Sequence, residues 1–206
     1  MRTHWTMPEQ TAALIFDCDG TLADTMPIHY RAWIAMLGTV GISFSEERFY
    51  QLGGMPTSKI IQLLSAETGV PVQDVEALVE QKEKHFLTLL HEVQPIPPVF
   101  AIAQQYMGRM PMAVASGGYR AVVQRTLETI GAAHWFGAIV CAEDTPKHKP
   151  EPDVFLEAAR RLGTTNTANV IVFEDTNIGM EAARRAGMQG IDVRDWLPPR
   201  PGENRQ

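Results

Sequence analysis

From about residue 99 onward the sequence alternates short apolar runs with helix-like segments, and this alternation constrains the fold more than any other feature. The runs cover residues 112–115, 138–141, 170–173 and 190–193, and an earlier run of the same kind covers 12–15. The segments between them carry apolar residues at helical spacing, and several end at a glycine. Buried strands that alternate with helices predict an α/β fold, a Rossmann-like parallel sheet with helices on both faces.

The region after the first run has a different pattern and contains no convincing strand. Apolar residues recur at helical spacing in four stretches, 27–37, 45–52, 57–66 and 71–90. Prolines at 95, 97 and 98 then interrupt the pattern and indicate a return linker. We therefore expect an α/β core formed by residues 1–25 and 94–206, with a small helical cap of the four-helix type, residues 26–93, inserted after the first strand. The proline-rich tail, 197–206, is expected to be loosely ordered.

Composition excludes several classes of protein. The 206 residues are 45% hydrophobic and 20% charged, with a formal net charge of −6 and scattered basic residues, so no basic face for nucleic acid is expected. No apolar run approaches the roughly 18 residues of a membrane span, and residues 1–10 lack the apolar core of a secretion signal. The two cysteines, Cys18 and Cys141, indicate small thiols of a cytoplasmic protein rather than a disulfide framework. We expect a monomer or weak oligomer without nucleic-acid or membrane partners.

Acidic residues follow the first apolar run directly. Asp17 and Asp19 lie one residue apart, and Gly20 and Thr21 come next. Carboxylate oxygens suit Mg²⁺, which tends to share its ligands with phosphate, and a carboxylate can itself attack phosphorus. The same residues also occur in ordinary surface turns. A Ca²⁺-binding loop is excluded because no further run of ligand residues follows.

Chemically useful residues also follow the other predicted strands. Ligands of open α/β sheets bind at the carboxyl ends of the strands, so these residues are expected to meet at one edge. Ser116, with the N–H groups of Gly117 and Gly118, suits phosphate oxygens, and Lys149 would supply positive charge. The pair Glu174–Asp175 would complete a Mg²⁺ site with Asp17, since so many acids repel one another without a cation.

Each of these groups has a plainer interpretation when taken alone. The Ser-Gly-Gly segment is typical of a strand-to-helix turn, and the Lys-Pro-Glu-Pro-Asp segment that ends at Asp153 is typical of a helix start. Glu174 and Asp175 could be a solvated pair that caps the next helix. Their occurrence in order at successive strand ends favours a functional site.

Together these motifs resemble those of the haloacid dehalogenase superfamily of phosphotransferases, over about residues 14–193. Within it, Asp24-Thr25 with His29 and Trp33, together with Phe173-Glu174-Asp175-Thr176 and Gly179, is similar to the β-phosphoglucomutase-like branch.

The resemblance implies catalytic roles for the core residues. Asp17 would attack the substrate phosphorus, and Asp19 would act as general acid and then general base. Ser116 and Lys149 would bind the transferring phosphoryl group. The ligands implied for Mg²⁺ are Asp17, the backbone carbonyl of Asp19, and Asp175, with Glu174 supporting. An acid at position 19 argues against carbon–halogen cleavage, because no leaving oxygen would need a proton there.

The cap favours a phosphatase over a mutase. True β-phosphoglucomutases carry an arginine soon after the glycine that corresponds to Gly54, where this chain has Thr57, with Lys59 as a partial substitute. The cap loop and the Lys147–Pro150 run look more like bacterial sugar phosphatases of the fructose-1-phosphate type. The residues expected to contact a sugar phosphate are Thr25, His29, Trp33, Gly54, Lys59 and Gly117.

Other interpretations of the chain stay open. Trp33 is about as compatible with the cap core as with a substrate contact. His29 could be a plain surface histidine, but its place beside the first motif favours a role in the site. Lys59 is as compatible with a solvated helix charge as with a substrate contact. A β-phosphoglucomutase would use the same core residues. A response-regulator receiver also has acids, a hydroxyl and a lysine at its strand ends, but the helical insertion argues against it. A silent phospho-sugar binder is disfavoured because every motif residue is present.

Overall fold

The computed structural model describes residues 5–201, which form two compact units. Residues 5–24 and 93–198 make an α/β unit, and residues 25–92 make a helical unit. Residues 199–201 group with the helical unit rather than with the α/β core in which the sequence placed them. The rest of the tail that was expected to be loosely ordered, 202–206, lies outside the described residues.

The described part of the α/β unit contains a five-stranded parallel sheet in the order β3-β2-β1-β4-β5. Its strands are β1 (Ala13–Phe16), β2 (Met112–Ala115), β3 (Ala138–Val140), β4 (Val170–Glu174) and β5 (Gln189–Asp192). On β1, Ile15 pairs with Ala113 of β2 on one side and with Val172 of β4 on the other. The chain therefore reverses its direction of strand addition between β1 and β4, which is where open α/β sheets carry their ligand sites.

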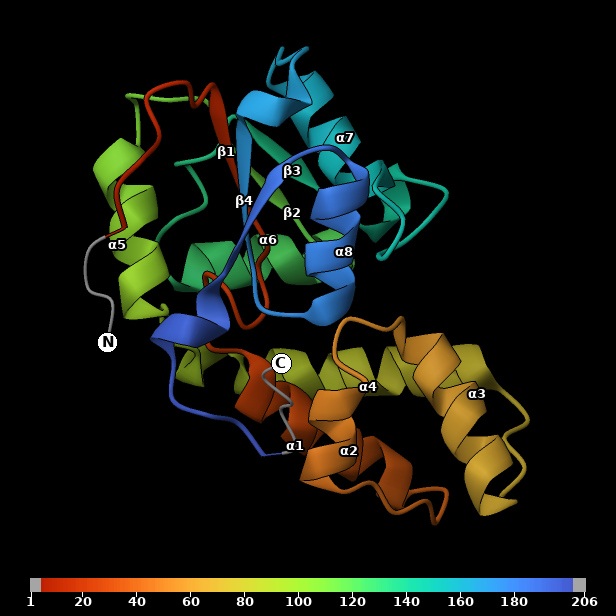
Figure 1. The fold of residues 1–206 in the computed structure, drawn as a ribbon. Coiled ribbons are helices and arrows are strands. Elements are labelled where there is room, and N and C mark those ends of the chain that lie inside the picture. Colours follow the sequence, from red (N-terminus) through yellow and green to blue (C-terminus); the bar gives the residue numbers. More distant parts are fainter. Residues whose placement is uncertain (1–4, 202–206) are drawn as a thin grey trace. The chain divides into compact units, whose positions relative to one another are not determined.

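The helices of this unit follow the predicted alternation closely. They are α5 (Pro97–Tyr106), α6 (Arg120–Thr129), α7 (Asp153–Arg161) and α8 (Asn177–Arg185), with short 3₁₀ turns at η2 (Ala142–Asp144), η3 (Thr167–Asn169) and η4 (Val193–Trp196). In Figure 1, α5 lies on one side of the sheet and α7 and α8 lie on the other. Gly163 and Gly187 follow α7 and α8 with φ of 73° and 70°, so each helix ends in the left-handed conformation that glycine tolerates best.

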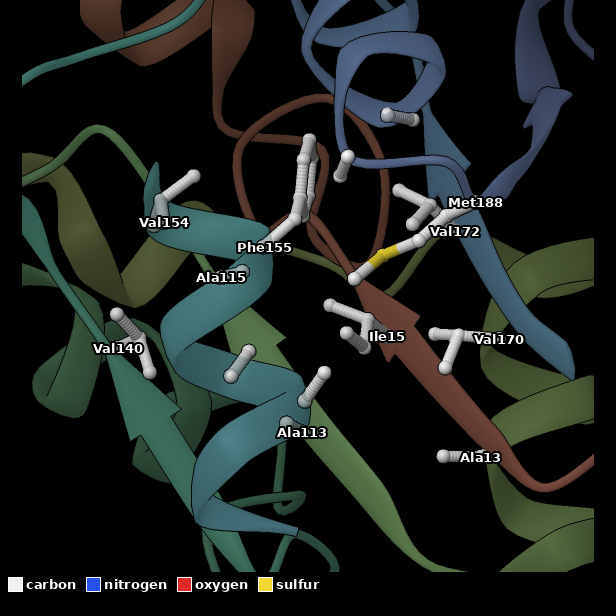
Figure 2. Packing of buried hydrophobic residues seen from close by; sticks show 14 of the residues in the cluster. Ala13, Ile15, Ala113, Ala115, Val140, Val154, Phe155, Val170, Val172 and Met188 are labelled. Atoms are coloured by element: carbon white, nitrogen blue, oxygen red, sulfur yellow. The ribbon is translucent and has the colours of Figure 1, made fainter. Parts of the chain in front are cut away.

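One face of the sheet packs small and branched side chains against α7 and α8. Ile15 lies near the middle of this face, and Figure 2 shows Val154 and Phe155 of α7 over the strands. The two helices turn alanine pairs toward the sheet, at positions 158–159 and 182–183, and all four alanines are buried. Small side chains let each helix approach the strands closely, which brings the first turns of α7 and α8 near the strand ends.

The opposite face is aromatic. Phe16 of β1 and Phe173 of β4 stack with ring centroids 4.7 Å apart, and Phe136 meets Phe16 edge-on at 5.9 Å. Trp5 contacts Phe173 at 5.2 Å. Ile15 and Phe16 point to opposite faces, and β1, β2 and β4 are buried on both sides, as their continuous apolar runs predict. The edge strand β5 is only partly buried.

The helical unit contains α1 (Met26–Gly38), α2 (Glu46–Gln51), α3 (Thr57–Thr68), α4 (Val75–Leu89) and the 3₁₀ turn η1 (Leu90–Glu92). Ser45 and Asp74 cap α2 and α4 by accepting backbone N–H groups at 3.2 and 2.9 Å. The Asp74 cap explains why α4 begins at Val75 and not at Pro71, where the apolar pattern begins. In the part of the chain that the structure describes, no helix combines the length and apolarity that crossing a bilayer would require.

Candidate active site

The site is built on the turn that follows β1. Asp17 continues the sheet by donating its N–H to Phe173 at 3.0 Å, and the chain then turns back on itself. The Cys18 carbonyl accepts the N–H groups of both Leu22 and Ala23 at 3.0 Å, and Gly20 has a φ of 82°. This turn requires the glycine, and it presents Asp17 and Asp19 at the carboxyl edge of the sheet.

Lys149 is buried between two carboxylates that come from different strands. Its Nζ donates to Asp17 Oδ1 at 2.7 Å and to Glu174 Oε2 at 2.8 Å, and it lies 4.9 Å from the centre of the Phe155 ring. Its side chain is 5% exposed. The ammonium group thus has two charged partners and one aromatic face in a setting with little water, where such contacts are strong.

Glu174, the last residue of β4, is held by the turn that leads into α8 as well as by Lys149. Its Oε1 accepts the N–H groups of Asp175 and Thr176 and the Thr176 hydroxyl, at 3.2, 3.0 and 2.7 Å. The Thr176 hydroxyl oxygen in turn accepts the Gly179 N–H at 3.1 Å and caps α8. Glu174 is therefore a buried acid with both oxygens engaged, and the alternative of a solvated capping pair does not hold.

The structure brings three acids together in one buried group. Asp17, Glu174 and Asp175 each offer an oxygen, and these oxygens lie within 4.8 Å of one another. The Thr21 hydroxyl donates to Asp175 Oδ1 at 3.2 Å and orients this acid. Three carboxylates face one ammonium group, so the residues present fit a divalent cation held by hard oxygen ligands.

The electrostatics of Asp17 agree with such a cation. Burial raises the pKa of Asp17 well above its ordinary value, and the carboxylates of Glu174, Asp175 and Asp19 raise it further, against the opposing effect of Lys149. Burial alone would lower the pKa of Lys149, but Asp17 and Glu174 outweigh it and the pKa lies above its usual range. Lys149 is thus held charged, and more positive charge beside Asp17 would favour its ionised form.

Ser116 and Asp19 lie on the same side of Gly118. Ser116 is buried, and its Oγ accepts the Gly118 N–H at 3.0 Å. A Cβ on Gly118 would lie 3.3 Å from Ser116 Oγ and 3.5 Å from Asp19 Oδ2. Gly117 is exposed, and a Cβ there would meet nothing within 4 Å. The hydroxyl, the acid and the glycine pair predicted at these strand ends therefore lie close together, with open space beside Gly117.

Sequence reasoning missed the anchor of the segment that leads to Lys149. Asp144, at the end of η2, accepts the Cys141 N–H at 2.7 Å and the Arg161 Nη2 donor at 2.8 Å, and also pairs with Arg120. Both arginines donate to the Ile139 carbonyl of β3. No local signal in the sequence indicates this cluster, because its members come from α6, η2 and α7. Phe155, whose ring faces Lys149, was missed for the same reason.

The helical unit holds the other predicted substrate contacts. Thr25 is buried at the start of α1, and Trp33 lies in the core of this unit, 5.5 Å from Phe44. His29 is half-buried and stacks on Phe86 at 4.0 Å. Gly54 and Lys59 are exposed. The structure places these residues within the helical unit, and their contact with substrate stays a prediction.

Lys82 is a buried cation that the sequence analysis did not single out. Its Nζ lies 3.0 Å from His29 Nδ1 and 2.9 Å from Glu83 Oε1, and it is near the Trp33 ring at 5.9 Å. A signal for it exists in the sequence, since position 82 falls on the face of α4 that carries Leu78 and Phe86. A charged residue on an apolar helix face is unusual and indicates a partnered side chain.

Both cysteines are free and buried. Burial raises the pKa of the Cys18 thiol well above its ordinary value and raises that of Cys141 to about 12. A raised pKa disfavours the thiolate form, and burial of both side chains agrees with packed thiols.

Comparisons with known proteins agree with this fold and site. The family model described as haloacid dehalogenase-like hydrolase matches residues 14–193. Fructose-1-phosphate phosphatase YqaB of Escherichia coli (strain K12) is 40% identical over 189 residues, which are 91% of this chain and 99% of that protein. The 6-phosphogluconate phosphatase of the same strain is 29% identical over 179 residues, 86% of this chain and 80% of that protein. The crystal structure of β-phosphoglucomutase from Clostridium difficile superposes with a TM-score of 0.80 at 23% identity, over 88% of this chain and 84% of that one.

The parallel sheet, the helical unit inserted after β1 and the buried acids at the strand ends define an α/β protein with an acidic site at the carboxyl edge of its sheet. The chain belongs to the haloacid dehalogenase-like hydrolase family. The predicted family and fold class are thereby confirmed, and the expected enzyme class, a phosphoric monoester hydrolase, agrees with the descriptions of the relatives.

Proposed function

We propose that this protein is a Mg²⁺-dependent phosphatase that hydrolyses small phosphorylated sugars, of the fructose 1-phosphate kind, through an aspartyl-phosphate. The observation that carries the proposal is the Lys149 ammonium held between the carboxylates of Asp17 and Glu174. It keeps a positive charge beside a buried carboxylate, which suits a nucleophile that must accept a phosphoryl group. The similarity to sugar phosphatases supports the substrate class.

In the first half-reaction, an Asp17 oxygen attacks the substrate phosphorus and the bond from phosphorus to the sugar oxygen breaks. Asp19 donates a proton to that leaving oxygen, so the sugar departs as a neutral alcohol. Lys149 and Ser116 bind oxygens of the transferring group. A Mg²⁺ ion bound by Asp17, the Asp19 carbonyl and Asp175, with Glu174 in support, would neutralise these carboxylates and the phosphoryl oxygens.

In the second half-reaction, Asp19 takes a proton from water, and that water attacks the phosphorus of the aspartyl-phosphate. The bond between phosphorus and the Asp17 oxygen breaks, which releases inorganic phosphate and restores the Asp17 carboxylate. The proton that Asp19 takes from water replaces the one it gave to the sugar, so the residue returns to its starting state.

The choice of water as final acceptor rests on the helical unit. Thr57 begins α3 where mutases carry an arginine for a second phosphate, and Lys59 in the same first turn is exposed. We propose that Lys59 and His29 contact the sugar, together with Thr25, Trp33, Gly54 and Gly117. A screen of phosphorylated sugars and sugar acids, with a coupled assay on β-glucose 1-phosphate, tests this choice. Net phosphate release supports a phosphatase, and formation of glucose 6-phosphate would identify a mutase.

Asp17→Asn is expected to abolish phosphate release, because a neutral amide at this position cannot form the aspartyl-phosphate. Steady-state phosphate release with Mg²⁺ measures the loss, and a circular dichroism spectrum checks that the fold is kept. Asp195→Asn, at an exposed acid in η4, is the matched control and should retain turnover. Wild-type turnover in Asp17→Asn would show that the nucleophile is a different residue.

Asp19→Ala is expected to make the aspartyl-phosphate accumulate, because no base then activates the water of the second half-reaction. Intact-mass spectrometry after mixing with substrate should detect added phosphoryl mass on Asp19→Ala and not on Asp17→Asn. Steady-state turnover equal to that of the wild type would exclude the acid–base role.

A further inference from the structure

Gly179 lies in the first turn of α8, directly against the carboxylate of Glu174. A Cβ built on Gly179 would lie 2.0 Å from Glu174 Cδ, 2.2 Å from Oε2 and 2.4 Å from Oε1. The φ of Gly179 is not positive, so its backbone is open to any residue. The constraint at this position is therefore space, and not backbone conformation.

The Glu174 carboxylate has no room to move aside at low cost. It is 1% exposed, and its Oε1 is held by two backbone N–H groups and the Thr176 hydroxyl. Its Oε2 accepts from Lys149, whose Nζ also holds Asp17 Oδ1. A side chain at position 179 would push the carboxylate off these partners, and Lys149 would lose one of the two groups that fix it beside Asp17.

We propose that Gly179 is a positioning residue for the reaction. The absence of its side chain leaves the space that the Glu174 carboxylate occupies, and Glu174 fixes Lys149 at Asp17. The role in turnover rests on the proposed function, whereas the steric relation between positions 179 and 174 does not depend on it. Helix propensity alone predicts the opposite effect on stability, because alanine normally stabilises a helix relative to glycine.

A double-mutant cycle on unfolding tests the steric relation without metal or substrate. Thermal unfolding in EDTA is measured for the wild type, Gly179→Ala, Glu174→Ala and the double variant. Gly179→Ala should lower the midpoint in the wild-type background, and should leave it unchanged or raise it when Glu174 is alanine. If Gly179→Ala fails to fold, the double variant should fold. An equal loss in both backgrounds, or failure of both variants to fold, would overturn the proposal.

Kinetics test the positioning role. With p-nitrophenyl phosphate as probe, Gly179→Ala should lower kcat on the order of 10²-fold with a small change in KM, since misplacing a supporting group by about 1 Å costs this much. Combining it with Glu174→Asp, whose carboxylate is one methylene shorter, should cost less than the product of the two single effects.

Gly38→Ala is the matched control, because Gly38 ends α1 and a Cβ there meets nothing within 4 Å. It should leave kcat unchanged. Wild-type kcat in Gly179→Ala, or multiplicative effects in the pair with Glu174→Asp, would overturn the positioning role. Should the wild type hydrolyse no phosphate ester, the proposed function fails and the unfolding cycle still decides the relation between Gly179 and Glu174.

Discussion

At the scale of single residues, Lys149 shows how far sequence reasoning extends. Its place after the third predicted strand and before a proline-rich helix start indicated a lysine at the edge of the sheet. That it contacts Asp17 and Glu174 at once, above the Phe155 ring, could not be predicted. Those partners are 132 and 25 positions away in the chain, and only the paired strands bring them within hydrogen-bond distance.

Lys149→Met is expected to destabilise the protein by about 3–5 kcal/mol, because it leaves two buried carboxylates without their ammonium partner. Urea unfolding in EDTA measures the change. Lys84→Met is the matched control, since Lys84 is 71% exposed and pairs with Glu80 on the surface of α4, so it should alter stability little. Equal stability of the two variants would contradict the importance of the buried pair.

At the scale of elements, α7 and α8 share a pattern that accounts for their similar packing. Both contain the letters Glu-Ala-Ala-Arg-Arg, beginning at Glu157 and Glu181. The alanines face the sheet, and each glutamate accepts from the two arginines that follow it. These arginines hold the pKa of Glu157 and of Glu181 near 2. Periodicity predicted both helices, but the link of Arg161 to Asp144 depends on the neighbouring turn.

Asp144→Asn is expected to weaken the protein by about 1 kcal/mol at neutral pH, through loss of charge-assisted hydrogen bonds at a partly exposed site. Partial burial would raise the pKa of Asp144, but Arg161, the Cys141 N–H and Arg120 together hold it below the ordinary 3.8. Because the folded pKa is lower than the unfolded one, the stabilisation is fully present above about pH 4 and disappears as the pH falls through the folded pKa.

Urea unfolding at pH 7 and at pH 3 measures the difference in the free energy of unfolding between the wild type and Asp144→Asn. This difference should be smaller at pH 3. The control is Asp195→Asn, which changes an exposed acid in η4 and should alter the free energy of unfolding little. If the wild type and Asp144→Asn differed in the free energy of unfolding by the same amount at both pH values, the charge of Asp144 would not be what stabilises η2.

At the scale of the whole molecule, strand order decides where the acids meet. In the order β3-β2-β1-β4-β5, β1 and β4 are neighbours, although most of the chain separates them. Asp17 therefore lies beside Glu174 and Asp175, and a strand order that separated β1 from β4 would disperse these acids. The predicted gathering at one edge followed from the rule for parallel sheets, whereas the particular neighbours came from the tertiary structure.

Mg²⁺ is expected to raise the thermal unfolding midpoint of the protein, because a cation that binds only the folded acids stabilises that state by mass action. A Mg²⁺ titration followed by differential scanning fluorimetry measures the shift, and EDTA should reverse it. Asp175→Asn should reduce the shift, whereas Glu80→Gln, at an exposed acid of α4, should keep it. A midpoint that does not respond to Mg²⁺ would contradict the proposed metal site.

Local patterns along the chain were enough to predict the alternation of strands and helices, the inserted helical segment and the residues at each strand end. Apolar periodicity, turn residues and caps are local, so they can be recognised along the chain. Tertiary structure alone decided which ends are neighbours, that Lys149 is shared by Asp17 and Glu174, and that Gly179 leaves space for a carboxylate. Each of these depends on contacts between residues of different elements, and no local pattern encodes such contacts.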